Sequence, residues 1–153
     1  MNNYLFLSAE SSPPAGYILS KTIFPAEAIF NQKHHAKEYG DALNSVGIIF
    51  ICTSEDLIAA GFYHDRKYIS HKKKYADYRL RLPFLPFIQA SEEQRMQMCL
   101  EIICAAAIDI KRKIPSFLAD KFCTDIKSAA AESTKLLPKE WDGNWRHRFD
   151  PHK

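Results

Sequence analysis

The chain has 153 residues, a length that favours one domain and is sufficient to bury a sizeable hydrophobic core. Apolar residues make up 46% and charged residues 25%, the proportions of an ordinary globular protein. The formal net charge of +3 shows that the chain as a whole is not a polycation, so any basic surface has to be local. We therefore expect a single domain over residues 1–153.

Neither export nor membrane insertion is indicated by the sequence. The first ten residues, MNNYLFLSAE, lack the basic start and the long apolar run of a signal peptide. The longest apolar runs, around Val46–Cys52 and Ile102–Ile108, are far shorter than the roughly 20 residues of a membrane helix. We expect a cytoplasmic protein.

The cysteines lie in apolar surroundings and lack the paired spacing of zinc motifs. Buried free thiols in a reducing compartment explain them best. The four are Cys52, Cys99, Cys104 and Cys123.

The first third of the chain predicts two strands and an uncertain segment between them. Asn3–Ser8 is aromatic and aliphatic and predicts a strand. Tyr17–Asn31 is ambiguous between strand and helix, with Pro25 as a boundary, and Asn31–Asn44 predicts a short helix and a loop. Ser45–Thr53, a continuous β-branched and aromatic run, predicts a central strand that is buried on both faces.

The segment 61–84 is the basic part of the chain and predicts a β-hairpin. It holds seven Lys or Arg residues and two acidic ones, whereas the rest of the chain is slightly acidic. Arg66–Ser70 is the outgoing strand, His71–Lys74 the turn and Tyr75–Phe84 the return strand. Along the return strand one face takes Tyr78, Leu80, Leu82 and Phe84, and the other takes Asp77, Arg79 and Arg81. One face is therefore core and the other is charged.

Two helices are predicted after the hairpin. Ser91 and Gln94 form a capping box, and the apolar spacing that follows continues to Lys113, where Pro115 ends the helix. A second helix over Ser116–Ala131 is expected to bury Leu118, Phe122, Ile126 and Ala130. The predicted fold class is α+β, a mainly antiparallel β-sheet with two C-terminal helices packed on one face.

Residues 132–153 differ in composition from the rest of the chain. Trp141, Trp145 and Phe149 stand among polar residues, glycine and proline. Such aromatic residues can anchor a partner, although they more often hold a terminal segment against its own domain. We expect an irregular tail packed on the domain.

Several functions could account for the basic hairpin. Lysines and arginines interleaved with tyrosines can bind phosphates and stack on bases, so nucleic-acid binding through residues 61–84 is the alternative function. Asp65 and Lys67, with Glu55 and Asp56, could hold Mg²⁺ in a nuclease, but such common residues also form salt-bridged strand edges. The six histidines are scattered without metal-ligand spacing, and no catalytic or phosphate-binding motif occurs, so we predict no metal, no cofactor and no catalytic residue.

A protein-binding surface on the polar face of the hairpin requires none of these motifs. Charged side chains and tyrosines on a sheet can offer charge-assisted hydrogen bonds and large rigid contacts. The predicted partner-binding residues are Arg66, Lys67, Tyr68, Tyr75, Asp77, Arg79 and Arg81.

Part of the chain also resembles a known family. The likeness lies in GIIFIC at Gly47–Cys52, GFY at Gly61–Tyr63, RKYIS at Arg66–Ser70 and KKYADYRLRL at Lys73–Leu82. These segments resemble the immunity proteins of bacterial polymorphic-toxin and contact-dependent inhibition systems, in particular immunity protein 44.

The resemblance implies a cytoplasmic protein, not an enzyme, that binds the C-terminal domain of a cognate toxin and blocks it. It does not supply the binding residues. Inhibitors of nuclease toxins are often acidic, whereas this chain is slightly basic. Either a local acidic patch meets the toxin, with Glu55, Asp56, Glu92 and Glu93 as candidates, or the toxin itself presents an acidic surface.

Overall fold

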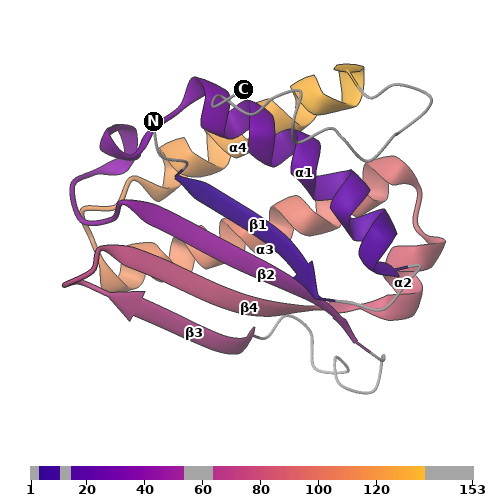
Figure 1. Cartoon of the computed structure of the whole chain (residues 1–153), viewed down its shortest axis with the longest axis horizontal. Coiled ribbons are helices and arrows are strands. Elements are labelled where there is room, and N and C mark those ends of the chain that lie inside the picture. The colour runs from indigo at the N-terminus through magenta and orange to yellow at the C-terminus, as the bar shows by residue number, and fades with distance from the viewer. Residues whose placement is uncertain (1–3, 11–14, 54–63, 137–153) are drawn as a thin grey trace.

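The computed structural model describes residues 4–10, 15–53 and 64–136, which form one sheet and a set of helices (Figure 1). The elements are, in chain order, β1 (Leu5–Glu10), α1 (Ala15–Lys33), the 3-10 helix η1 (Ala36–Tyr39), β2 (Ser45–Thr53), β3 (His64–Ser70), β4 (Tyr75–Pro83), α2 (Phe84–Gln89), α3 (Glu92–Lys113) and α4 (Ala119–Leu136). No helix among them is long and apolar enough to cross a membrane.

The four strands lie in the order β1-β2-β4-β3, and the sheet is mixed. β1 pairs with β2 and β2 pairs with β4 in parallel, and only the β3–β4 hairpin is antiparallel. The predicted α+β class is confirmed, but the prediction of a mainly antiparallel sheet is wrong. The reason is α1, because a helix between β1 and β2 carries the chain back across the sheet and makes the two strands parallel.

The segment Tyr17–Asn31, which the sequence left ambiguous between strand and helix, is part of helix α1. Pro25 lies inside it and is not a boundary, so that expectation is wrong. A proline in a helix interior loses one backbone hydrogen bond, but the surrounding turns of α1 are held by burial, since Ile23, Ile29 and Phe30 are all inaccessible to solvent. The helices are therefore not confined to the C-terminal part of the chain.

The strands bury one face, and this corrects the expectation for β2. Val46, Ile48 and Phe50 are buried, as a central strand requires, but Ile49 and Ile51 on its other face are only half-buried. The hairpin and its alternation are confirmed, with Tyr78, Leu80 and Leu82 in the core and Asp77 exposed. Phe84 begins α2, which the sequence analysis missed, and its side chain is outside the described ones.

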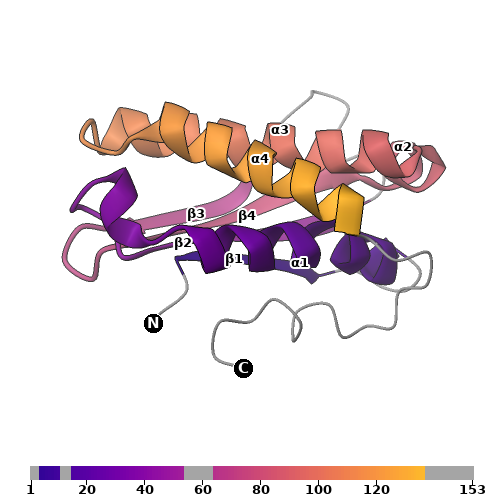
Figure 2. The same ribbon diagram turned by 90° about the horizontal axis from the view of Figure 1, so that it is seen from above.

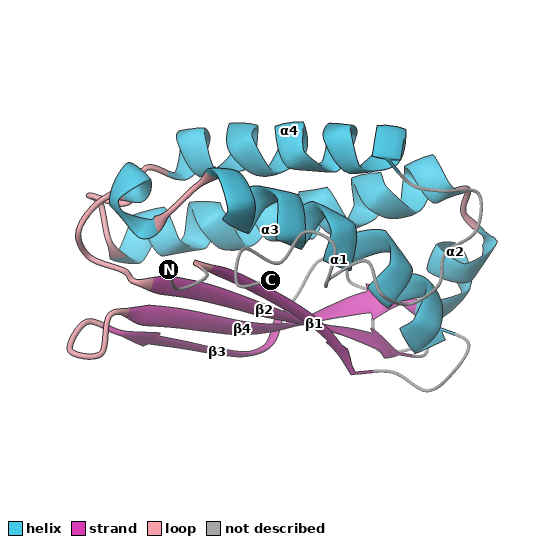
Figure 3. Cartoon of the chain, turned by 45° about the horizontal axis from the view of Figure 1, so that its top comes forward, coloured by secondary structure: helices cyan, strands magenta, loops and turns pink. Residues whose placement is uncertain are grey.

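The helices lie in two layers on the buried face of the sheet (Figures 2 and 3). α1 packs on β1, and α4 packs on α1 and α3 as the outermost helix of Figure 3. The capping box of α3 is confirmed, because the Ser91 hydroxyl accepts from Gln94 N–H at 3.2 Å and the Gln94 side chain accepts from Ser91 N–H at 2.9 Å.

Helix α4 begins three residues later than predicted. Leu118 precedes it, donates its N–H to the Tyr39 carbonyl at 3.1 Å and is 46% exposed, so the expected burial of its side chain is wrong. The expected burial of Phe122, Ile126 and Ala130 is confirmed. The Trp-rich segment lies outside the described residues.

Candidate protein-binding surface

No described helix covers the second face of the sheet, which we call the open face (Figure 3). The strand register places Phe6, Gly47, Asp77 and Tyr68 in one row across all four strands. The next row holds Ser8, Ile49, Arg79 and Arg66. The open face consists of these eight positions together with Ile51, Tyr75 and Arg81, which continue the alternation along β2 and β4.

Aromatic side chains lie at both sides of the open face. Phe6 on β1 is 45% exposed and Tyr68 on β3 is 53% exposed. The Tyr68 ring contacts that of Tyr75, with their centroids 5.4 Å apart, so the two rings support each other. Exposed aromatic groups held on a rigid sheet are the kind of side chain that contributes most to the affinity of protein interfaces.

Asp77 and Gly47 are adjacent at the centre of the open face. A Cβ atom on Gly47 would overlap the Asp77 Oδ1 atom, so the absence of a side chain at Gly47 lets this carboxylate lie across β2. Partial burial in this position raises the pKa of the Asp77 carboxyl. Arg79 and Arg81, half-buried on the same face of β4, add two guanidinium groups. The centre of the face is thus charged and its sides are aromatic.

The structure brings most of the predicted binding positions together but not all of them. Tyr68, Tyr75, Asp77, Arg79 and Arg81 share the open face, and Arg66 pairs in register with Arg79. Lys67 pairs with Tyr78 instead, in a row of the helix-covered face, because successive residues of a strand alternate between faces. The side chains of Arg66 and Lys67 are outside the described ones, and so are Glu55, Asp56 and the side chain of Asp65 from the nuclease hypothesis.

The sequence analysis missed the contribution of the other strands to this surface. Phe6 belongs to a segment that was predicted as a strand without an assigned face, and Ile49 and Ile51 to a strand that was predicted to be buried on both faces. The only sequence signal was the alternation of Phe6 with Leu5 and Leu7. It could not be interpreted without the strand order, which sets which face of β1 the helices cover.

A second polar group connects η1 to α4 on the helix side of the molecule. His34 Nδ1 lies 3.0 Å from Glu38 Oε1 and 3.6 Å from Asp125 Oδ2. Lys121 donates to both carboxylates, at 3.1 Å to Glu38 and 2.7 Å to Asp125. Tyr39 donates its hydroxyl to Asp125 at 2.8 Å. We call these five residues the clasp.

The clasp has ligand types that could hold a metal, but its own lysine already supplies a cation. His34, Glu38 and Asp125 are the one set of three such groups that lie close together among the described residues. The Lys121 ammonium bonds both of its carboxylates, so a metal ion would have to displace it. The His34 ring is half-buried and lies against Phe30, with ring centroids 5.1 Å apart.

The clasp perturbs the titration of its carboxylates. Burial acts to raise the pKa of Glu38, but hydrogen bonds from the His34 ring and Lys121 and from a backbone N–H outweigh burial, and the pKa falls to about 2. The pKa of Asp125 is likewise lowered against the effect of burial, by Lys121 and Tyr39. These shifts are those of a structural ion-pair network.

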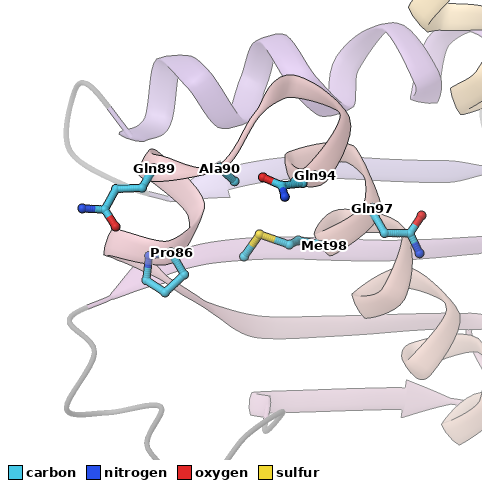
Figure 4. A pocket seen from close by; sticks show the side chains of 6 residues that line it. All are labelled: Pro86, Gln89, Ala90, Gln94, Gln97 and Met98. Carbon is cyan, nitrogen blue, oxygen red and sulfur yellow. The ribbon is translucent and has the colours of Figure 1, made fainter.

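Described residues of the helices line cavities on the helix side. A pocket of about 450 Å³ between α2 and the first turns of α3 is lined by Pro86, Gln89, Ala90, Gln94, Gln97 and Met98 (Figure 4). Its lining has no titratable group, and Gln94 is engaged in the capping box. A groove of about 810 Å³ between α1, α3 and α4 has an apolar floor that includes Met96 and Leu100, and a rim of charged side chains. In the groove lining, Lys21 and Glu92 form an ion pair, with Nζ and Oε1 3.6 Å apart.

The comparison with protein families gives one match, to immunity protein 44, over residues 3–132. The chain belongs to this immunity protein family. The match extends from β1 to within the last turns of α4, so it includes every strand of the open face. The resemblance inferred from segments between Gly47 and Leu82 is confirmed. Neither the comparison with curated proteins nor that with solved structures gives a match.

Proposed function

We propose that this immunity protein neutralises a cognate bacterial toxin domain by forming a stoichiometric complex with it through the open face. The observation that carries this proposal is a four-stranded sheet, inside the family match, whose second face no described helix covers and which holds exposed aromatic side chains. Binding alone suffices for such an action, and no cofactor takes part in it. The bacterial cytoplasm is the compartment where a toxin has to be blocked.

The chemistry of the open face matches the two requirements of a tight inhibitor. Phe6, Tyr68 and Tyr75 can supply the apolar and aromatic contacts that give most of the affinity of an interface. The guanidinium groups of Arg79 and Arg81 can form bidentate bonds with carboxylates of the toxin, and their charge speeds association and selects the partner. The toxin surface that fits is therefore acidic at its centre, opposite the two arginines, and apolar at its sides.

The test is calorimetry with a toxin domain, taken from the C-terminus of a large secreted protein whose gene adjoins that of this chain, where such a gene is present. The wild-type protein is expected to form a one-to-one complex with a dissociation constant in the nanomolar range and to rescue growth when it is co-expressed. The double variant Arg79→Glu/Arg81→Glu should weaken the complex by at least about 100-fold, since each lost charge-assisted contact is worth roughly 1.5–3 kcal/mol.

The matched control is Lys37→Glu/Lys135→Glu, which changes the net charge equally at exposed positions of η1 and α4. This control should bind like the wild type. A folded Arg79/Arg81 variant that binds as tightly as the control would exclude the open face. Absence of any complex or rescue would exclude neutralisation by binding.

A further inference from the structure

The outer edge of β1 is closed by side chains of α1. Asn31 Oδ1 accepts from the backbone N–H groups of Tyr4 at 3.1 Å and Leu5 at 2.9 Å, and Asn31 Nδ2 donates to the Leu5 carbonyl at 2.7 Å. The Glu27 carboxylate accepts from Leu7 N–H. Both side chains are buried, at 4% and 2% exposure, so they act as a partner strand in the position where a further β-strand would have paired.

The opposite edge of the sheet has no such cover among the described residues. β3 pairs with β4 on one side, and no described strand pairs with its other side. An edge strand of seven residues has a row of backbone donors and acceptors on its outer side, and the described residues provide no strand to pair with them. Within the part of the chain that the structure describes, the β1 edge is therefore closed by side chains, whereas the β3 edge can accept a further strand.

The charge along this edge indicates which kind of strand can be added. β3 carries Arg66 and Lys67 against a single acid, Asp65, and the turn that follows exposes Lys72, Lys73 and Lys74. A second copy of β3 would bring like charges into register, which opposes pairing between two molecules of this protein. An acidic strand would instead meet the opposite charges of Arg66 and Lys67, and beyond the end of β3 those of the lysines in the turn.

We propose that β3 binds an extended acidic segment of the toxin by strand addition, so that the sheet continues from this protein into its partner. This inference rests on the proposed function, and it makes the open face and the β3 edge one continuous surface. Backbone hydrogen bonds would supply affinity that does not depend on the side chains of the partner, and the lysines of the turn would select acidic sequences.

The decisive experiment is solution NMR of the full chain, labelled with ¹⁵N, in complex with the unlabelled toxin domain used above. Backbone nuclear Overhauser contacts between residues 64–70 and the toxin are expected, together with slower amide exchange in β3. The amides of β1 serve as the internal control, because Asn31 and Glu27 already occupy that edge, and their exchange should not change. A complex without backbone contacts at β3 would overturn the strand addition and leave the proposed function standing, whereas no complex would overturn both.

A charge variant tests the selection of an acidic segment. Lys72→Glu/Lys73→Glu changes two exposed residues of the turn and should weaken binding about 10-fold, with a reduced dependence of affinity on salt. The control Lys37→Glu/Lys135→Glu should leave both quantities unchanged. Equal affinities for the two variants would overturn the electrostatic selection. A dimer of the free protein, detected by sedimentation and removed by a substitution in β3, would show that a second copy is the occupant instead.

Discussion

At the scale of single residues, Tyr4 is notable because its buried hydroxyl has no hydrogen-bond partner among the described residues. The residue is 1% exposed and its ring stacks on Tyr39, with centroids 5.3 Å apart. Its hydroxyl makes no hydrogen bond to any described residue, and burial raises its pKa. We expect Tyr4→Phe to stabilise the fold by about 1 kcal/mol, since it removes an unpaired buried polar group and keeps the ring. Urea unfolding followed by circular dichroism measures this, and a variant less stable than the wild type would contradict it.

Gly47 and Asp77 give a second prediction at this scale, concerning coupling. Gly47→Ala alone should cost about 1 kcal/mol, because the new methyl group has to displace the Asp77 carboxylate. In an Asp77→Ala background the same change should become neutral or stabilising, since alanine is the better residue once the space is open. A double-mutant cycle measured by urea unfolding gives the coupling free energy between Gly47 and Asp77. Equal effects of Gly47→Ala in both backgrounds would show that the carboxylate does not depend on this glycine.

At the scale of elements, the clasp ties η1 to α4 and makes this connection sensitive to acid. The pKa of Glu38 is near 2 in the folded protein, against an ordinary value of 4.5. A lowered folded pKa stabilises the protein above pH 4.5, and this contribution is lost as the pH falls towards 2. The free energy of unfolding should therefore decline over this interval, and Glu38→Gln should decline less steeply while being less stable at pH 7. If the free energy of unfolding of the two proteins changed with pH in parallel, Glu38 would not be the cause of the decline.

The closed edge of β1 gives the second prediction for an element. Asn31→Ala would remove the partner of the Tyr4 and Leu5 N–H groups and of the Leu5 carbonyl in a buried site, so we expect a loss of about 3 kcal/mol. The control is Gln32→Ala, one residue further along α1 and exposed, which should change the stability by less than about 0.5 kcal/mol. If both substitutions had equal effects, the strand edge would not depend on Asn31.

At the scale of the whole molecule, an aromatic cluster joins parts of the chain that are distant in sequence. Phe122 of α4 is inaccessible to solvent and lies 5.4–6.2 Å, between ring centroids, from Tyr4, Phe30, Tyr39 and Phe117. Phe122→Ala should cost about 3–5 kcal/mol, because it opens a cavity where β1, α1, η1 and α4 meet. Thermal and urea unfolding measure this. A decrease of less than about 1 kcal/mol in the free energy of unfolding would show that contacts other than those of Phe122 hold α4 in place.

Some parts of the whole fold were predictable from the sequence and others were not. The hairpin, the start of α3 and the central position of β2 follow from local signals, namely alternation, a capping box and a β-branched run. The parallel pairing did not follow, because it depends on whether residues 15–33 form a helix, and Pro25 is a local signal against one. Burial of one side of α1 against β1 overrides that signal, and burial of this kind cannot be read from a segment taken alone.

The candidate site was predictable within the hairpin only. Tyr75, Asp77, Arg79 and Arg81 alternate on one strand, so their common face was visible in the sequence. Phe6 and Ile49 join them only through the strand order, and Lys67 was misplaced because the alternation of β3 was not applied to it.

Because side chains alternate along the strands, stability and partner binding depend on different residues of the same sheet. Along β2 and β4 each core side chain is followed by one of the open face, so half of the positions maintain stability and the other half meet the outside. Substitutions at 49, 68, 75 and 79 can therefore accumulate without disturbing the hydrophobic core. The binding face of such proteins could therefore diverge as the toxin changes, while the core that stabilises the fold stays the same. A library randomised at these four positions is expected to yield variants with new toxin specificities.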